Sequence, residues 1–477
     1  MSVASVAHRA GVARRGPAAR KRSRAAAQPV EYSLLLTATL CLLAFGAVMV
    51  FSASSTTSVL GEGGDGAEYL KRTLLFGGLG LVAMRILSVK GLAAARSLTP
   101  ALLVASLALL VVVLVPGVGL DANGARRWIG VGPIQVQPSE IAKLALILYG
   151  AHLIAIRPRL VRDIRSMAPY LLVVAVACAL IVVEPDLGSA LVAAFAVAAL
   201  LVAGGARIRH LAVVAAGLAL VAIVAIVIEP YRQDRVTGFL DPTGDAGGAG
   251  FQGIQASIAL GSGGVLGVGL GESVQKAFYL PEAHTDMIAA VIGEELGLLG
   301  MTVLVGLFTL FGYAGFRTAQ RARDGYGKLL AAGLTALVLV QAVVNLFAVM
   351  GMAPLTGVPL PFVSYGNSNL LVMLAAVGLM LNVARGGRAP ARARPVRPRA
   401  AAPRRASGRP ARSGRLRVVD GGSSPTRITR HQPVASKSWA SPPMLGARAK
   451  PSDRRDRGRR DGRARRAGTR RRRRAAR

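Results

Sequence analysis

Three ionisable side chains stand within five residues of one another, immediately before a long apolar segment. They are Glu282, His284 and Asp286, and the apolar segment itself contains Glu294 and Glu295. An ionisable group at or inside a membrane helix is costly unless it faces a protein cavity, so such groups mark functional sites. We therefore predict a site here, in which a carboxylate acts as a general base on a hydroxyl.

A structural role for Asp286 is the competing interpretation. Asp286 follows Thr285 and precedes the apolar run, so either residue suits the N-terminus of a helix, where a side-chain oxygen accepts backbone N–H bonds. Capping does not account for the neighbouring Glu282 and His284. Whether Glu294 or Glu295 joins the site stays open from the sequence.

Two further groups carry cations. In QPSEIAK, Glu140 and Lys143 are three residues apart and share one helix face, so they form either a structural ion pair or part of a cavity in which Lys143 binds an anion. In RRW, Arg126, Arg127 and Trp128 suit an interfacial aromatic belt with flanking cations, or an arginine clamp on phosphate.

Polar residues recur at three other breaks between apolar segments. Glu184 and Asp186 flank Pro185 in EPDLG, where Asp186 either caps the next helix or lines a cavity. The segment 359–369, PLPFVSYGNSN, places Ser364 among several hydroxyls and amides, as backbone packing or as a lined cavity. The glycine-rich run 261–271 does not suit a nucleotide loop, and we interpret it as flexible or re-entrant backbone.

Composition places these groups in a membrane protein. The chain has 477 residues, of which 52% are hydrophobic, and a mean hydropathy of +0.47. About 20 apolar residues span a bilayer. We predict an all-α, polytopic protein whose ten spanning segments are 32–52, 69–89, 99–116, 138–156, 168–183, 187–204, 208–229, 287–315, 329–352 and 366–385. We expect no cleavable signal peptide, because the first apolar run is long enough to span.

Charge predicts the orientation. Basic residues fall in alternate connections, and with the N-terminus inside they satisfy the positive-inside rule, with both termini cytoplasmic. The connections 117–137 and 230–285 then lie on the extracytoplasmic side, and 230–285 is a large loop between the seventh and eighth segments. Loops of this length are usually functional, so we expect the site to face outward at the plasma membrane.

The net charge of +36 comes from the two ends of the chain. We predict a basic, disordered cytoplasmic N-terminus at 1–30, a membrane domain at 31–385 and an Arg/Pro-rich disordered tail at 386–477. The tail suits anionic lipids of the inner leaflet, a docking segment for cytoplasmic partners, or non-specific nucleic-acid binding. Cys41 and Cys178 both lie in apolar runs and predict neither a disulfide nor a metal site.

Carboxylates and cations thus converge from several helices on one outer face. A carboxylate can activate a hydroxyl, and Arg or Lys can stabilise the charge on a departing diphosphate. This pairing suits glycosyl transfer from a lipid diphosphate. Diphosphate is a good leaving group, so the pair of carboxylates that glycosidases use is not required.

At these residues the chain resembles the SEDS family of shape, elongation, division and sporulation proteins. The resemblance covers about residues 32–385 and rests on these motifs, in order: RRWIGVGPIQVQPSEIAK, EPDLG, GFQ-x-IQ followed by ALGSGG, YLPEAHTDMIAAVIGEELG and GVPLPFVSYG. It implies a ten-helix, outward-facing polymerase. Such an enzyme joins lipid II, an undecaprenyl-diphosphate-linked disaccharide peptide, into glycan strands.

The resemblance also implies roles for single residues. The family's catalytic aspartate falls on Asp286, and its loop arginine and helix lysine fall on Arg127 and Lys143. Its polar cavity includes the positions of Glu140, Asp186 and Ser364; Glu282 and His284 join these as candidate substrate-binding residues by their position beside Asp286. The last motif departs from the family, because Asn367 and Asn369 stand where small residues are usual. Asn tolerates positive φ, so we expect the turn to survive.

The resemblance implies partners as well. A class B penicillin-binding transpeptidase and other division proteins are expected, together with anionic lipids at the basic tails and no specific nucleic acid. No cofactor is certain, and a divalent cation, Mg²⁺ or Mn²⁺, stays an open requirement. The end of the first segment, MVFSASS, and the long tails favour a division-type over an elongation-type polymerase. A lipid II flippase and a non-catalytic division scaffold are the alternatives.

Overall fold

The computed structural model describes residues 29–61, 66–122, 125–131, 134–277 and 279–386. The predicted basic tails therefore lie almost wholly outside the described residues. The elements are α1 Val30–Gly61, α2 Glu68–Val113, β1 Gly119–Ala122, β2 Ala125–Val131, β3 Ile134–Val136, α3 Pro138–Ile156, the 3-10 turn η1 Leu160–Arg162, α4 Ile164–Val183, α5 Leu187–Ala203, α6 Ile208–Ile228, α7 Pro230–Leu240, α8 Phe251–Ser262, α9 Ile288–Arg321, α10 Gly325–Val349 and α11 Asn367–Ala384.

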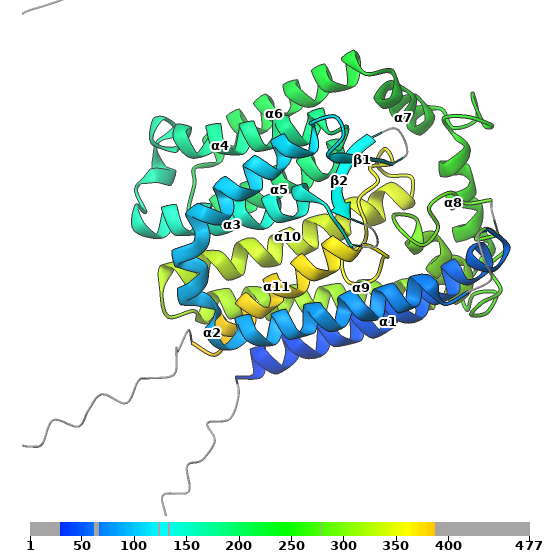
Figure 1. The fold of residues 1–477 in the computed structure, drawn as a ribbon, viewed down its shortest axis with the longest axis horizontal. Coiled ribbons are helices and arrows are strands. Elements are labelled where there is room, and N and C mark those ends of the chain that lie inside the picture. Colours follow the sequence, from blue (N-terminus) through cyan, green and yellow to red (C-terminus); the bar gives the residue numbers. More distant parts are fainter. Residues whose placement is uncertain (1–28, 62–65, 123–124, 132–133, 278, 387–477) are drawn as a thin grey trace, which may run out of the picture. The chain divides into compact units, whose positions relative to one another are not determined.

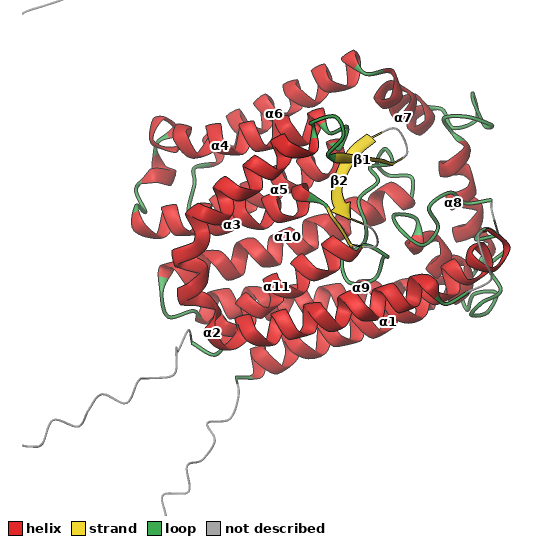
Figure 2. Ribbon diagram, viewed as in Figure 1, coloured by secondary structure: helices red, strands yellow, loops and turns green. Residues whose placement is uncertain are grey.

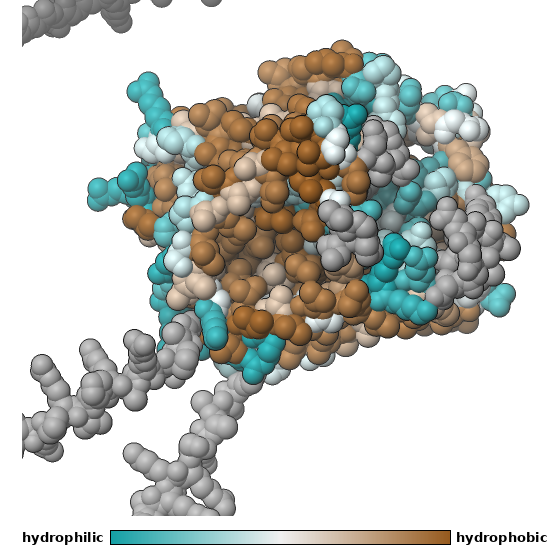
Figure 3. Space-filling model, viewed as in Figure 1, coloured by the Kyte–Doolittle hydropathy of each residue, from teal (hydrophilic) through white to brown (hydrophobic). Residues whose placement is uncertain are grey.

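Each of the ten predicted spanning segments falls on a helix. Among the described residues, eight helices are long and apolar enough to cross a membrane, and α5 is a shorter apolar helix. Figure 2 shows the dominance of helices, and Figure 3 shows apolar side chains covering them between hydrophilic ends. The predicted break between the fifth and sixth segments is confirmed, because α4 ends and α5 begins on either side of Glu184–Asp186.

The second and third predicted segments share one helix, α2. Its 46 residues would measure about 69 Å if straight, more than twice the hydrocarbon thickness of about 30 Å. Near the start of α2, the ring of Tyr69 lies 4.4 Å from the ring of His284. The C-terminal end of α2 leads into the sheet. Between them, Arg96 pairs with Asp324, at the turn between α9 and α10, at 2.6 Å. The helix therefore crosses twice, bending back as Figure 1 shows, and the loop expected around Lys90–Arg96 is helical.

Helices α10 and α11 form the centre of the membrane domain. In each of these helices, 78% of an apolar stretch of 18 residues is buried inside the protein, whereas in α6 the share is 6%. Helix α11 packs against α1, α2, α3, α9 and α10. Close packing requires small residues here: a β-carbon at Gly378 would lie 2.6 Å from the carbonyl oxygen of Met84 on α2. Helix α6 lies at the edge of the domain (Figure 1).

A three-stranded antiparallel sheet, ordered β1-β2-β3, departs from the all-α prediction. Leu120 pairs with Trp128, and Ile129 pairs with Val136. Apolar and β-branched residues bounded by glycines favour short strands. The sheet is tied to α11, because the backbone N–H of Gln137 donates to Ser368 Oγ at 3.0 Å and Ser368 Oγ donates to the Gln135 carbonyl at 3.1 Å. This end of the domain, where α9 also begins, is called the sheet end below.

Helix α9 is broken at Gly297, whose backbone has φ 61° and ψ −157°. The glycine-rich segment 263–269 docks at the break: Val268 N–H donates to the Glu294 carbonyl at 3.0 Å, and Leu298 N–H donates to the Gly264 carbonyl at 3.0 Å. Backbone groups freed at membrane depth must find such partners. Of the two interpretations of this segment, the structure supports docked, re-entrant backbone.

Candidate active site

Asp286 lies two residues before α9, at the sheet end, and is half-buried. Asn345 Nδ2 on α10 donates to its backbone carbonyl at 2.7 Å and to that of Val358 at 2.8 Å, which fixes the loop before α9 against the loop before α11. Thr285 Oγ1 donates to Asp286 Oδ1 at 3.2 Å. The N-cap position of α9 is Met287 and, among the described residues, no side chain caps this helix, so the Asp286 carboxylate is not used as a cap.

The surroundings of Asp286 suit a base near neutral pH. Burial raises the pKa of its carboxyl to about 6, the negative charge of Glu282 adds to this rise, and Arg235 opposes it. Arg235 belongs to α7 and reaches the same place: a β-carbon at Gly357 would lie 3.8 Å from both Asp286 Oδ2 and Arg235 Nη1. An acid with this pKa is mostly ionised at neutral pH and still accepts a proton readily.

Glu282 and His284 shape the loop that carries Asp286. Glu282 is exposed, has φ 55° and accepts a hydrogen bond from Thr285 Oγ1 at 2.9 Å. The His284 ring packs against Tyr69 and against Tyr365, at 4.4 and 5.6 Å between ring centroids. Burial lowers the pKa of His284, which favours the neutral imidazole, and the charge of Glu282 opposes this shift. Glu282 thus acts on Asp286 through its charge, whereas the His284 ring packs against two tyrosines.

Glu140 and Lys143 form a closed polar network rather than the wall of a cavity in this structure. Lys143 Nζ lies 2.8 Å from Glu140 Oε1 and donates to Gln341 Oε1 at 2.9 Å, and neither charged side chain is exposed. Asn369 Nδ2 donates to the second oxygen of Glu140 at 2.9 Å. Gln341 in turn donates to the Pro359 carbonyl at 3.0 Å.

This network explains Asn369, one of the two departures from the family motif. Asn367 begins α11 and does not adopt a positive φ, and Gly366 before it has an extended φ of 175°. The expectation that asparagine's tolerance of positive φ preserves this turn is therefore wrong. Ser364 is buried and accepts a hydrogen bond from the Leu360 N–H at 2.8 Å, which closes the turn before α11.

Arg127 and Asp186 meet at the EPD turn. The Arg127 guanidinium donates to the carbonyls of Glu184 and Pro185, the former at 3.1 Å. Asp186 caps α5 by accepting from the Ser189 N–H at 3.0 Å, and it also accepts from Gln137 Nε2 at 3.1 Å. The Gln137–Asp186 bond joins this turn to the start of α3, whereas Asn345 ties the loop of Asp286 to the loop before α11.

Glu294 and Glu295 face away from these clusters. Glu294 accepts from Ser273 Oγ and, at 3.0 Å, from the Val274 N–H. Glu295 accepts from Ser52 Oγ at 2.7 Å and pairs with Lys276 Nζ at 2.9 Å. Both carboxylates anchor the segment after the glycine-rich run, and neither lines the cavities described next.

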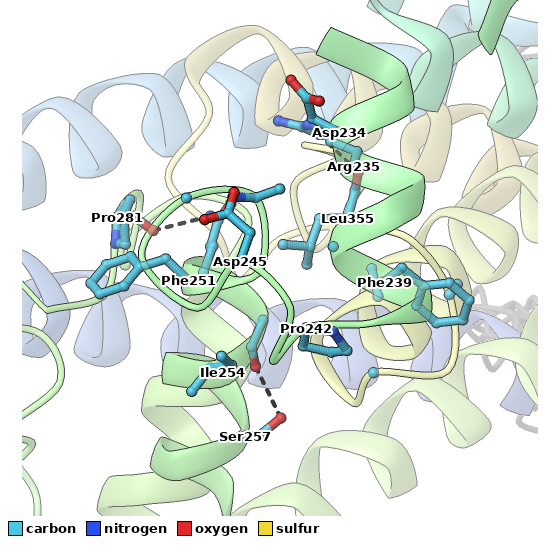
Figure 4. A pocket seen from close by; sticks show the side chains of 18 of the residues that line it. Asp234, Arg235, Phe239, Pro242, Asp245, Phe251, Ile254, Ser257, Pro281 and Leu355 are labelled. Carbon is cyan, nitrogen blue, oxygen red and sulfur yellow. Dashed lines mark hydrogen bonds between the residues drawn. The ribbon is translucent and has the colours of Figure 1, made fainter. Parts of the chain in front are cut away.

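Two cavities share Arg235, the residue that lies near Asp286, although Asp286 itself lines neither. The first, of about 1000 Å³, lies between α7, α8, the C-terminal end of α10 and the loop that follows it (Figure 4). The second, of about 650 Å³, lies between α5, α6, α7 and α10 and is mainly apolar. Tyr231, Arg235, Ala353 and Leu355 line both, so α7 and the loop after α10 divide them. Arg127 reaches the second cavity, and none of the other predicted site residues lines either one.

Sequence reasoning missed Arg232 and Arg235, which line the second cavity. The available signal was the sequence PYRQDR, with two arginines three apart after a proline in the long outer connection. The connection 230–285, predicted as a loop, also contains the helices α7 and α8. Among the described residues, no group of three or more His, Cys, Asp or Glu could hold a metal ion.

The fold and the site define a multi-pass membrane protein in which a half-buried carboxylate lies near one of the arginines that line an apolar cavity. The model of the FtsW/RodA/SpoVE cell cycle protein family matches residues 32–389. The chain belongs to this family.

Curated relatives agree with this assignment. The chain is 41% identical over 357 residues to stage V sporulation protein E of Bacillus subtilis, covering 74% of this chain and 97% of that protein. It is 41% identical over 360 residues to the probable peptidoglycan glycosyltransferase FtsW of Trichlorobacter lovleyi, covering 75% and 94%.

Solved structures share the fold. A chain from a peptidoglycan synthase complex that coordinates polymerization and crosslinking has a TM-score of 0.61 at 35% identity, covering 74% of this chain and 96% of that one. The rod shape determining protein RodA of Thermus thermophilus has a TM-score of 0.55 at 31% identity, covering 74% and 95%.

Proposed function

We propose that this protein is a peptidoglycan glycosyltransferase that polymerises lipid II into glycan strands during cell division. One observation carries the proposal: the Asp286 carboxyl, with a pKa of about 6, lies near Arg235, and Arg235 lines both cavities. Relatives named FtsW, about 40% identical, support the division role.

The reaction forms one glycosidic bond and breaks one bond to diphosphate. Asp286 accepts the proton of the acceptor sugar hydroxyl while that oxygen attacks the anomeric carbon of the donor. The bond from this carbon to the diphosphate oxygen breaks, and the polyprenyl diphosphate leaves with both bonding electrons. Cations stabilise the charge on the leaving group, a role that the family resemblance implies for Arg127 and Lys143. Arg127 lines the second cavity, whereas Lys143 is paired with Glu140.

A divalent cation, Mg²⁺ or Mn²⁺, fits the site only in part. The described residues hold no cluster of metal-ligating side chains, so the cation would take much of its coordination from the substrate diphosphate and water. When bound there it would neutralise charge on the leaving group. Asp286 and Glu282 are the carboxylates of the candidate site that would supply ligands to such a cation.

The setting follows from the same proposal. The sheet end faces the extracytoplasmic side and both termini are cytoplasmic, which the distribution of basic residues supports. A class B penicillin-binding transpeptidase is the proposed partner and would crosslink the strands. The likeness to a chain from a synthase complex that coordinates polymerization and crosslinking supports this pairing.

The test is polymerisation of lipid II by the purified protein, with and without a class B transpeptidase and with Mg²⁺ or Mn²⁺. We expect a ladder of glycan strands that Asp286→Asn abolishes. The matched control is Glu272→Gln, an exposed carboxylate of the same outer connection, which should keep the ladder. No ladder from folded, partner-bound protein would refute the proposal. Transfer of lipid II across vesicles without polymer would then support a flippase, and partner binding alone a scaffold.

A further inference from the structure

Three arginines from two separate elements line the apolar cavity. Arg127 comes from β2, and Arg232 and Arg235 stand three residues apart on one face of α7. Their side chains are held by backbone carbonyls and a hydroxyl. Arg232 donates to the carbonyls of Ala225 and Val182 at 2.9 and 2.6 Å, and Arg235 donates to the Leu355 carbonyl at 2.8 Å and to the Tyr231 hydroxyl.

Within the described part of the chain, no carboxylate forms an ion pair with any of these three guanidiniums. Glu184 and Asp286 are near enough for Arg127 and Arg235 to lower their pKa values, while Asp234 and Glu229 on and before α7 are exposed. Arg232 Nε is buried and has no hydrogen-bond partner there. Partly desolvated cations without paired anions are costly, so the site is built for a negatively charged ligand.

The rest of the cavity specifies the other end of that ligand. Its walls are aliphatic and aromatic side chains of α5, α6 and α10: Leu191, Phe195, Ala222, Ile226, Leu339, Val340, Val343, Val344 and Phe347. Helix α6 is the most exposed of the membrane helices described, so a chain from the bilayer can enter beside it. The cavity therefore suits an amphiphile with a long apolar chain and a compact, multiply charged anionic head.

We infer that Arg232 and Arg235, together with Arg127, bind the diphosphate of a polyprenyl-linked substrate whose chain lies between α5, α6 and α10. Guanidinium forks match phosphate oxygens in pairs. Arg235 also lines the larger cavity (Figure 4) and lies near Asp286. The leaving diphosphate and the reacting sugar would therefore meet at this residue. Lys143 stays in its closed pair with Glu140.

The inference rests on the proposed function for the identity of the lipid, and binding tests it separately from polymerisation. Undecaprenyl diphosphate, undecaprenyl monophosphate, inorganic diphosphate and phosphatidylglycerol are titrated into the full chain in detergent. We expect the lipid diphosphate to bind best, and Arg232→Gln and Arg235→Gln each to weaken it about tenfold or more. Arg209→Gln, an exposed arginine at the far end of α6, is the control and should bind as the native protein does.

Loss of folding is a separate matter, because Arg232 ties α7 to the ends of α4 and α6. Arg232→Lys and Arg235→Lys keep the charge and lose the paired hydrogen bonds, so they should bind between the native protein and the Gln variants. Thermal unfolding of each variant is followed alongside. Gln variants that fold, and bind undecaprenyl diphosphate as tightly as the native protein, would overturn the inference.

The other arms separate the sources of the anion. Equal, arginine-dependent binding of phosphatidylglycerol would make this a general lipid site and would refute the inference. Inorganic diphosphate that binds as tightly as the lipid would refute the role of the apolar walls. Arginine-dependent binding without any polymerisation by the native protein would uphold the site and refute the proposed function. Polymerisation that survives both Gln substitutions would uphold the proposed function and refute the site.

Discussion

Lys143 Nζ lies 2.8 Å from Glu140 Oε1 on the next turn of α3, and both side chains are fully buried. Gln341 and Asn369 complete the hydrogen bonding of the pair. A buried pair that is satisfied in this way connects α3, α10 and α11 beneath the sheet end. The pair lines neither cavity, so we expect it to stabilise the packing of these three helices.

Removing one partner of this pair should destabilise the protein strongly. Lys143→Met leaves Glu140 buried without its cation, which costs about 3–5 kcal/mol, whereas Glu140→Gln with Lys143→Met should cost less. Thermal unfolding in detergent measures this order. Glu68→Gln, which removes an exposed carboxylate paired with Arg72, is the control and should cost about 1 kcal/mol or less. A double variant no more stable than either single one would contradict the prediction.

The rate of polymerisation should depend on pH through Asp286. The base must be ionised, so kcat/KM should fall as pH drops through about 6, the pKa of this carboxyl. Glu282→Gln removes a neighbouring negative charge that raises this pKa, so the acidic limb should move to lower pH. Steady-state rates between pH 5 and 8 measure the shift. An acidic limb that moves upward, or stays in place, would show that Glu282 does not act on Asp286.

Glu184 should make the protein less stable as pH rises. Both of its carboxylate oxygens are buried without a hydrogen-bond partner among the described residues, and burial raises its pKa to about 9. The folded pKa exceeds the unfolded value of about 4.5, so its contribution to stability is fully present below pH 4.5 and is lost as pH rises to 9.

Glu184→Gln removes this dependence. Between pH 5 and pH 7, the free energy of unfolding of the variant should rise by about 2 kcal/mol relative to that of the native protein. The unfolding midpoints of the two proteins, compared at both pH values, measure the gain. A constant difference between them would show that Glu184 is ionised in the folded protein.

Gly297 should not tolerate a side chain. Its φ of 61° belongs to the left-handed region, and a β-carbon would clash with the backbone nitrogen of Gly267. Gly297→Ala should cost about 1–3 kcal/mol and release the docked segment, which limited proteolysis would detect. Gly306→Ala in the same helix meets nothing within 4 Å, so it should be neutral or slightly stabilising. Equal stability of the two variants would argue against the docked break.

The sequence by itself determined the membrane class, the ten apolar segments and the cluster around Asp286. These depend on local properties: the length of apolar runs, and ionisable residues placed where a membrane helix begins. The same properties predicted His284 and Glu282 as substrate-binding residues beside Asp286, and those roles stay predictions.

Only the tertiary structure decided which charged groups face a cavity. Arg232 and Arg235 looked like part of a loop, and Lys143 looked free to bind an anion, because sequence spacing does not show what covers a side chain. The single helix α2 also escaped prediction, since the basic residues between its two apolar runs suggested a loop, whereas the backbone stays helical there. Burial and pairing arise from contacts between distant segments, and those contacts place Arg235 beside Asp286.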